Sequence, residues 1–155
     1  MSFNTDAGGT AINAKIKVFG SATTWNTRLS QIARVKGEVI ICTYSFMDLD
    51  YIKQILDKRF KMVTIIANSK FQNEAQKLKN TYPTLRMLLS TKMHSKMVLI
   101  HPETVWITSA NFWKSTNFES TVGIKSKEAY SVCMNQFLKF CKENLITEIK
   151  EVQTN

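Results

Sequence analysis

Apolar and polar residues alternate in blocks along the chain, and their spacing predicts strands and helices that follow one another. Blocks dense in β-branched residues predict strands at Ala14–Phe19, Glu38–Phe46, Lys61–Ala67, Leu85–Leu89, Lys96–Ile100, Thr104–Thr108 and Glu119–Ile124. Apolar residues at helical spacing, and one polar block, predict helices at Trp25–Val35, Leu49 to about Phe60, Ser69 to about Tyr82, and Lys127 to about Ile149. This alternation predicts an α/β layered domain in which helices flank a mixed β-sheet.

Residues at the element boundaries support these assignments. Asp48 is a candidate N-cap of the second helix, Ser69 of the third, and Pro83 ends the third helix. The last helix is the longest, and its expected core positions are Val132, Phe137, Phe140, Leu145 and Ile149. We find no internal repeat, so we expect a single domain over residues 1–155 with its core at about 14–150.

Composition adds a class of partner to this picture. The chain has 155 residues, of which 44% are hydrophobic, which is enough for one core of useful size. Its 21 Lys and Arg exceed its 12 Asp and Glu, and the resulting charge of +9 favours polyanions as partners. Charge alone does not separate DNA, RNA and an anionic membrane, and basic residues also serve solubility alone.

The cysteines and the chain termini exclude several other classes. Cys42, Cys133 and Cys141 lack the spacing of a zinc site or a disulfide framework, so we expect reduced thiols in or near the core. The polar N-terminus predicts no signal peptide, and no segment has the apolar length of a membrane span. We therefore expect a cytoplasmic protein without stable membrane association, and no cofactor.

A histidine and a lysine lie two residues apart where the fifth strand is predicted to begin. Alternation along a strand would place His94 and Lys96 on the same face. Ser109 and Asn111 follow the next predicted strand. An imidazole beside a fixed positive charge suits phosphate chemistry, because imidazole attacks or carries protons near neutral pH while the ammonium neutralises phosphoryl charge.

These residues resemble a known signature. His94-x-Lys96, then Ser109-x-Asn111, then Asn117-x-Glu119 is similar to the HxK…D…GSxN signature of the phospholipase D superfamily with its downstream N-x-E. The segment from Ile41 to Asp48, with the helix and strand after it, resembles the first βαβ unit of the small bacterial nucleases of that superfamily. The resemblance extends over residues 18–149 and implies a phospholipase D-like fold.

The resemblance also implies a mechanism and roles. His94 would attack phosphorus to give a covalent phosphohistidine while a second histidine protonates the leaving oxygen. Because the chain carries one such motif, we expect a homodimer that brings two copies into one cleft. Lys96 and Asn111 would hold the phosphate oxygens, Glu119 would orient the His94 ring, and Ser109 is a further candidate for an oxygen contact. No carboxylate cluster is spaced for Mg²⁺, so we expect a metal-independent reaction.

Two positions depart from the signature. His101 stands where the family has an aspartate, and Thr108 replaces the glycine of GSxN. His101 is adjacent to Pro102 and is also explained as a turn residue. Thr108 would narrow the pocket, since glycine allows a closer approach.

The favoured function is a homodimeric endonuclease acting on DNA or RNA, with Lys92, Lys114 and Trp113 as candidate substrate-binding residues. For Trp113 a role as a core or dimer-interface anchor is favoured over base stacking. Two alternatives stay open: a phospholipid phosphodiesterase or phosphatidyl transferase, and a catalytically inactive nucleic-acid-binding module.

Overall fold

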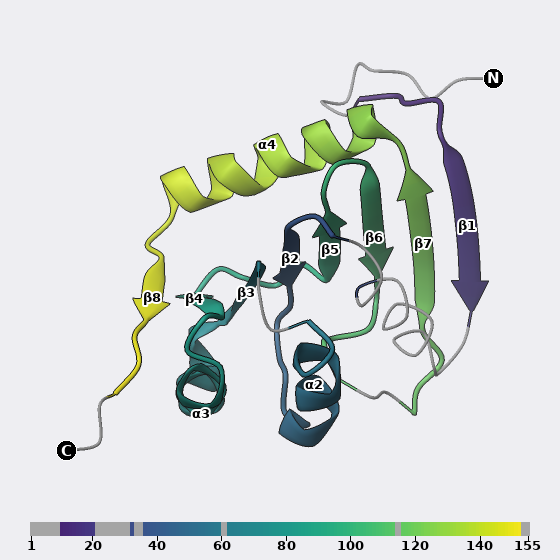
Figure 1. Ribbon diagram of the computed structural model, residues 1–155. Coiled ribbons are helices and arrows are strands. Elements are labelled where there is room, and N and C mark those ends of the chain that lie inside the picture. Colours follow the sequence, from purple (N-terminus) through teal and green to yellow (C-terminus); the bar gives the residue numbers. More distant parts are fainter. Residues whose placement is uncertain (1–9, 21–31, 33–35, 60–61, 114–115, 153–155) are drawn as a thin grey trace.

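The computed structural model of the protein describes residues 10–20, 32, 36–59, 62–113 and 116–152 (Figure 1). Its strands are β1 Lys15–Gly20, β2 Val39–Cys42, β3 Val63–Asn68, β4 Arg86–Ser90, β5 Met97–Ile100, β6 Thr104–Thr108, β7 Ser120–Lys125 and β8 Thr147–Ile149. Its helices are α2 Leu49–Leu56, the 3₁₀ helix η1 Ser69–Phe71, α3 Gln72–Thr81 and α4 Lys127–Glu143. The predicted helix Trp25–Val35 lies outside the described residues except for Ile32.

The strands of the described part form one mixed sheet in the order β1-β7-β6-β5-β2-β3-β4-β8. Strands β2, β3 and β4 are parallel, whereas β5, β6, β7 and β1 continue the sheet with antiparallel pairings. Helices α2 and α3 cover one face, where Ile41 and Ile65 lie in the core. Helix α4 crosses the other face and packs over Ile40 and Leu99 (Figure 1). The α/β architecture with a mixed sheet flanked by helices is therefore confirmed.

Most predicted elements differ from the structure by one or more residues at their ends, and helix α2 ends at Leu56 rather than at about Phe60. Strand β2 ends at Cys42 rather than Phe46. The next two residues still bond to β3, since the Thr43 amide donates to the Ile66 carbonyl at 3.0 Å and the Asn68 amide donates to the Tyr44 carbonyl at 3.2 Å, and the loop to α2 follows. Asp48 caps α2 as predicted, its carboxylate accepting the Tyr51 amide at 3.1 Å. The predicted cap at Ser69 is wrong, since the side chain of Asn68 accepts the Lys70 amide at 3.1 Å and Ser69 lies inside η1.

The predicted last helix is too long. Helix α4 ends at Glu143, and the side-chain amide of Asn144 donates to the Phe140 carbonyl at 2.8 Å. The chain then forms β8 along the open edge of β4, which satisfies main-chain groups that a longer helix would leave unpaired. Phe137 is buried, Val132 and Phe140 are half-buried, and Ile149 is buried in β8 rather than in a helix. Leu145 is 85% exposed, so its assignment to the core is wrong.

An apolar row crosses the α4 face of the sheet. Met97, Ile107, Val122 and Val18 are successive register partners on β5, β6, β7 and β1. Helix α4 leaves this row uncovered toward the sheet edge, where Ile107 is 46% and Val18 68% exposed. We call this row the apolar stripe. Exposed apolar surface of this kind marks interaction sites in soluble proteins.

Two glycines on neighbouring strands make a matched test of packing. A Cβ on Gly123 would lie 2.4–2.8 Å from the ring of Trp106, which is 3% exposed, whereas a Cβ on Gly20 would lie 3.1 Å from the ring of Phe118, which is 81% exposed. The buried ring has no room to move, so we expect Gly123→Ala to lower the free energy of unfolding by about 1–3 kcal/mol. The exposed ring can move aside, so we expect Gly20→Ala to be neutral or stabilising by about 0.5 kcal/mol.

Denaturant unfolding of both variants against the wild type measures this difference. Equal destabilisation by the two substitutions would contradict the packing described for Gly123 and Trp106.

Candidate active site

His94 and Lys96 lie in the loop just before β5, not on a strand as predicted. Lys96 nevertheless reaches back, so that its Nζ donates to the His94 carbonyl at 3.1 Å and lies 3.4 Å from His94 Nδ1. The side chain of His94 is exposed and that of Lys96 half-buried. The Lys96 ammonium can only donate, so His94 Nδ1 is the acceptor wherever these two groups form a hydrogen bond.

Tyr44 forms a wall beside these two residues. Its ring centroid lies 5.1 Å from that of His94, and Lys96 Nζ lies 6.0 Å from the same ring. Tyr44 follows β2 and is half-buried. The sequence analysis gave it no role, although it is one of the polar residues that interrupt the apolar run after β2.

A buried asparagine holds the loop that carries His94. Asn68 ends β3, is 5% exposed, and its side-chain amide donates to the carbonyls of Thr91 and Met93, both at 3.1 Å. The backbone amide of Met93 also donates to the Ser90 carbonyl. Asn68 was missed in the sequence, where its position between a strand and a helix was the available signal. It fixes the backbone immediately before His94.

The loop after β6 carries Ser109 and Asn111 and is anchored from β2. The Thr43 hydroxyl accepts the Phe112 amide at 2.9 Å and donates to the Ser45 carbonyl at 2.8 Å. The Ser45 amide donates to Asn111 Oδ1 at 3.4 Å. Asn111 is thus turned toward the end of β2, where Tyr44 lies, by contacts across 66 residues of sequence.

Ser109 and Glu119 meet at the neighbouring strand ends. The Ser109 hydroxyl donates to the Glu119 carboxylate and accepts the Ser120 amide at 3.0 Å. The Thr108 amide donates to the Lys96 carbonyl at 3.1 Å, which links this pair to the His94 loop. All five predicted catalytic residues therefore lie at one end of the sheet, on the adjacent ends of β5, β6 and β7. The predicted bond from Glu119 to the His94 ring stays a prediction.

The two residues that depart from the signature, His101 and Thr108, do not line the cavity beside His94. His101 is in the turn after β5, at the opposite end of that strand, with its ring 5.6 Å from the Tyr130 ring. Thr108 is 8% exposed; its hydroxyl lies 2.9 Å from that of Thr121 and accepts the Ala110 amide at 3.0 Å. Its side chain is used to hold the loop, and it does not line the cavity beside His94.

A cavity of about 400 Å³ opens beside His94 on the α4 face. Its walls are mostly apolar, and its lining consists of Cys42, Lys92, Met93, His94, Ser95, Met97, Ile107, Cys133, Gln136, Phe137 and Phe140. Lys92 is exposed at this cavity, as a substrate-binding role requires, and Trp113 is half-buried next to Asn111. Lys114 lies outside the described residues.

The three cysteines are free thiols, as expected. Burial raises the pKa of Cys42 to about 12, with smaller contributions from Cys141 and Cys133, and burial also raises the pKa of Cys133. Both cavity thiols therefore stay protonated at neutral pH and are poor nucleophiles. Within the described ranges, no three His, Cys, Asp or Glu side chains gather as a metal site. None of the helices described is long and apolar enough to span a bilayer.

Comparisons with known proteins agree with this architecture. Among solved structures, NucT from Helicobacter pylori matches with a TM-score of 0.70 and 21% identity over 86% of this chain and 99% of its own. Nuc from Salmonella typhimurium, a phospholipase D family member, gives 0.73 and 17% over 90% of this chain and 100% of its own. Phosphatidylserine synthase from Haemophilus influenzae gives 0.60 and 15% over 92% of this chain but 42% of its own. Identities this low establish the fold alone.

The sequence itself carries the family assignment. No curated protein matches the chain significantly. A family model described as the phospholipase D-like domain of cardiolipin synthase matches residues 29–141, which include the whole candidate site. With this match and the fold in agreement, the chain belongs to the phospholipase D-like family.

Proposed function

We propose that the protein is a metal-independent phosphodiesterase that cleaves nucleic acid through a covalent phosphohistidine at a homodimer interface. The observation that carries the proposal is the exposed imidazole of His94 with the Lys96 ammonium 3.4 Å from its Nδ1, at the same end of the sheet as the Ser109–Glu119 pair. This arrangement supplies a nucleophile and a fixed positive charge that stabilises the phosphoryl group in the transition state.

The proposed reaction has two displacements. Nε2 of one neutral His94 ring attacks phosphorus, the bond to the leaving oxygen breaks, and that oxygen takes the Nε2 proton of His94 of the partner subunit, whose ring begins as an imidazolium and becomes neutral. The partner's His94 then removes a proton from water, whose oxygen attacks phosphorus and breaks the phosphorus–nitrogen bond. Lys96 and Asn111 hold the non-bridging oxygens in both steps.

The two rings need different protonation states. The donor ring must be an imidazolium with a proton on each nitrogen, so that it is neutral after it gives up its Nε2 proton and can then take a proton from water. The attacking ring must be neutral and carry its proton on Nδ1. Glu119 is the proposed acceptor for that proton, and it would keep the Nε2 lone pair directed at phosphorus.

A second copy of the chain supplies the second imidazole in this proposal. The sequence has two histidines, and His101 lies at the far end of β5 from His94. The apolar stripe supports a homodimer, because it begins at Met97, three residues from His94, and runs uncovered to the sheet edge. An isologous interface that includes this stripe would bring two sites toward one axis.

Nucleic acid is the proposed substrate because of charge. The chain carries a net charge of +9, and Lys92 and Lys96 accompany His94 at the site. Because each lysine can contact a different phosphate, several lysines together favour a substrate with several phosphates over one with a single phosphate.

One observation favours a second candidate, a phospholipid phosphodiesterase or phosphatidyl transferase. The cavity beside His94 has a volume of about 400 Å³ and is lined by Met93, Met97, Ile107, Phe137 and Phe140. Such a cavity would also accommodate the apolar part of a lipid whose phosphate lies at His94.

Substrate assays in excess EDTA separate these candidates. We expect the wild type to cleave plasmid, single-stranded DNA or RNA, and His94→Ala to lose about 10²- to 10⁴-fold in rate, because it removes the proposed nucleophile. His101→Ala is the matched control and should retain activity. Release of lipid headgroups from vesicles instead would support the second candidate, and binding without turnover would indicate an inactive module.

Subunit mixing tests the shared site. If each active site needs two His94 rings, an equimolar, fully exchanged mixture of wild type and His94→Ala should retain about one quarter of the wild-type activity of the same total protein. Independent sites would retain about one half, which is the result against the shared site. Light scattering of the same samples reports whether the protein is a dimer.

Substitution of Asn68 tests the loop that carries His94. Asn68→Asp keeps the shape but cannot donate to both the Thr91 and Met93 carbonyls. We expect kcat to fall about 10- to 100-fold with a smaller change in KM, because the reacting ring is misplaced. Asn73→Asp, on the exposed side of α3, is the control. An unchanged kcat in folded Asn68→Asp would show that this asparagine does not position His94.

A further inference from the structure

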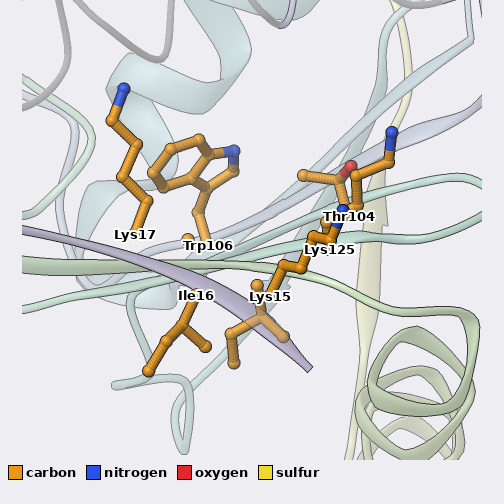
Figure 2. Close-up of a pocket in the computed structure, with 8 residues that line it drawn as sticks. Lys15, Ile16, Lys17, Thr104, Trp106 and Lys125 are labelled. Carbon is orange, nitrogen blue, oxygen red and sulfur yellow. The ribbon is translucent and has the colours of Figure 1, made fainter. Parts of the chain in front are cut away.

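A second cavity, with a volume of about 220 Å³, lies on the sheet face opposite α4 and is rich in lysine (Figure 2). Lys15 and Lys17 come from the edge strand β1, Lys125 from β7, and Thr104 and Trp106 from β6. We call these five residues the lysine groove. Figure 2 shows Lys17 on one side of the Trp106 indole, and Lys15 and Lys125 on the other side together with Thr104.

The groove has a defined floor. Trp106 is 3% exposed and lies over Gly123, where a Cβ would approach its ring to 2.4 Å. Strand alternation divides β1 into two faces, with Lys15 and Lys17 on the groove side and Ile16 and Val18 on the other. The groove is therefore separate from the apolar stripe, and a partner bound on the stripe does not need to cover it.

Like charges face each other across two neighbouring strands of the groove. Lys15 and Lys125 are direct register partners on neighbouring strands, an arrangement in which like charges repel and destabilise the sheet. Lys125 pairs with Glu103 at 3.2 Å, and no carboxylate of the described residues lies within ion-pair distance of Lys15. Lys15 thus faces another ammonium group across the register, and an anion in the groove would relieve this repulsion.

The position of the groove identifies the kind of anion. Strand β7 begins beside Glu119 at the candidate active site and ends at Lys125 in the groove. At about 3.3 Å per residue, the two ends are about 17 Å apart. The rise of nucleic acid is about 3.4 Å per nucleotide, so phosphates about five nucleotides from the cleaved bond reach the groove.

We infer that the lysine groove binds the phosphate backbone of the nucleic-acid substrate at a distance from the cleaved bond. Lys15 and Lys17, about 7 Å apart along β1, contact successive phosphates, and the Thr104 hydroxyl donates to a phosphate oxygen. This inference rests on the proposed function for the substrate class. The contacts carry no sequence information, so they strengthen binding to any sequence of sufficient length.

The test compares two double variants that remove the same charge. Lys15→Gln with Lys17→Gln empties the groove of two ammonium groups, whereas Lys139→Gln with Lys142→Gln removes two from the exposed face of α4. Binding of duplex DNA of about 30 base pairs is measured by fluorescence anisotropy over a series of salt concentrations, in EDTA and in the His94→Ala background. We expect the groove variant to reduce the slope of log K against log salt by about 1.8, and the α4 variant to change it far less.

Thermal unfolding of the free proteins provides a second measurement. Because Lys15→Gln alone relieves the repulsion between Lys15 and Lys125, this single variant should melt at or above the wild-type temperature in low salt. A clear loss of melting temperature would indicate that Lys15 stabilises the free protein, which contradicts the inference.

Other outcomes are equally decisive. Equal changes in slope for both double variants would show that only the total charge matters and not its place in the groove, which would overturn the inference. Groove-dependent binding to vesicles of phosphatidylglycerol but not to DNA would overturn the choice of nucleic acid. Hydrolysis of bis(p-nitrophenyl) phosphate, which is too small to reach the groove, reports on the wild-type active site alone, so a failure of catalysis is distinguished from a failure of the groove.

Discussion

The antiparallel pairing of β5, β6 and β7 is the constraint on which the candidate site depends. The pairing brings the start of β5, the end of β6 and the start of β7 to the same end of the sheet. His94 with Lys96, Ser109 with Asn111, and Glu119 are attached at these three points. A slip of one residue in either register would reverse the faces of the side chains and separate the groups. The chemistry therefore depends on sheet register before it depends on any single side chain.

Buried polar side chains then fix the loops beyond the strand ends. Asn68 and Thr43 are 5% and 0% exposed, and each makes hydrogen bonds to loop backbone. Unpaired buried polar groups cost about 1–3 kcal/mol each, so these contacts select one loop conformation. Thr108 acts in the same way at the position where the signature has glycine. Where a glycine would leave the backbone of this loop more mobile, the Thr108 hydroxyl bonds to Thr121 on β7 and to the Ala110 amide and so restrains it.

The sequence predicted the sheet and the candidate site more accurately than the helix ends and the supporting residues. Strand β6 was predicted at the observed bounds, because β-branched residues between turn residues leave few alternatives. The end of α4 was missed because Leu145 and Ile149 continue a helical spacing, whereas pairing with β4 decides the structure. The contact between His94 and Lys96 was expected for a wrong reason: it comes from a folded-back side chain in a loop rather than from strand alternation. Tyr44 and Asn68 were missed because their roles arise from contacts between distant segments.

The central claim is that one His94 attacks phosphorus while the His94 of a second subunit handles the proton. Trapping the reaction with DNA by a rapid alkaline quench, followed by mass spectrometry of the intact chain and its peptides, tests this most directly. The account predicts a nucleotide adduct on His94 that saturates at about one per two subunits, because the two rings share one phosphate. Cleavage without an adduct, or one adduct on every chain, would contradict it.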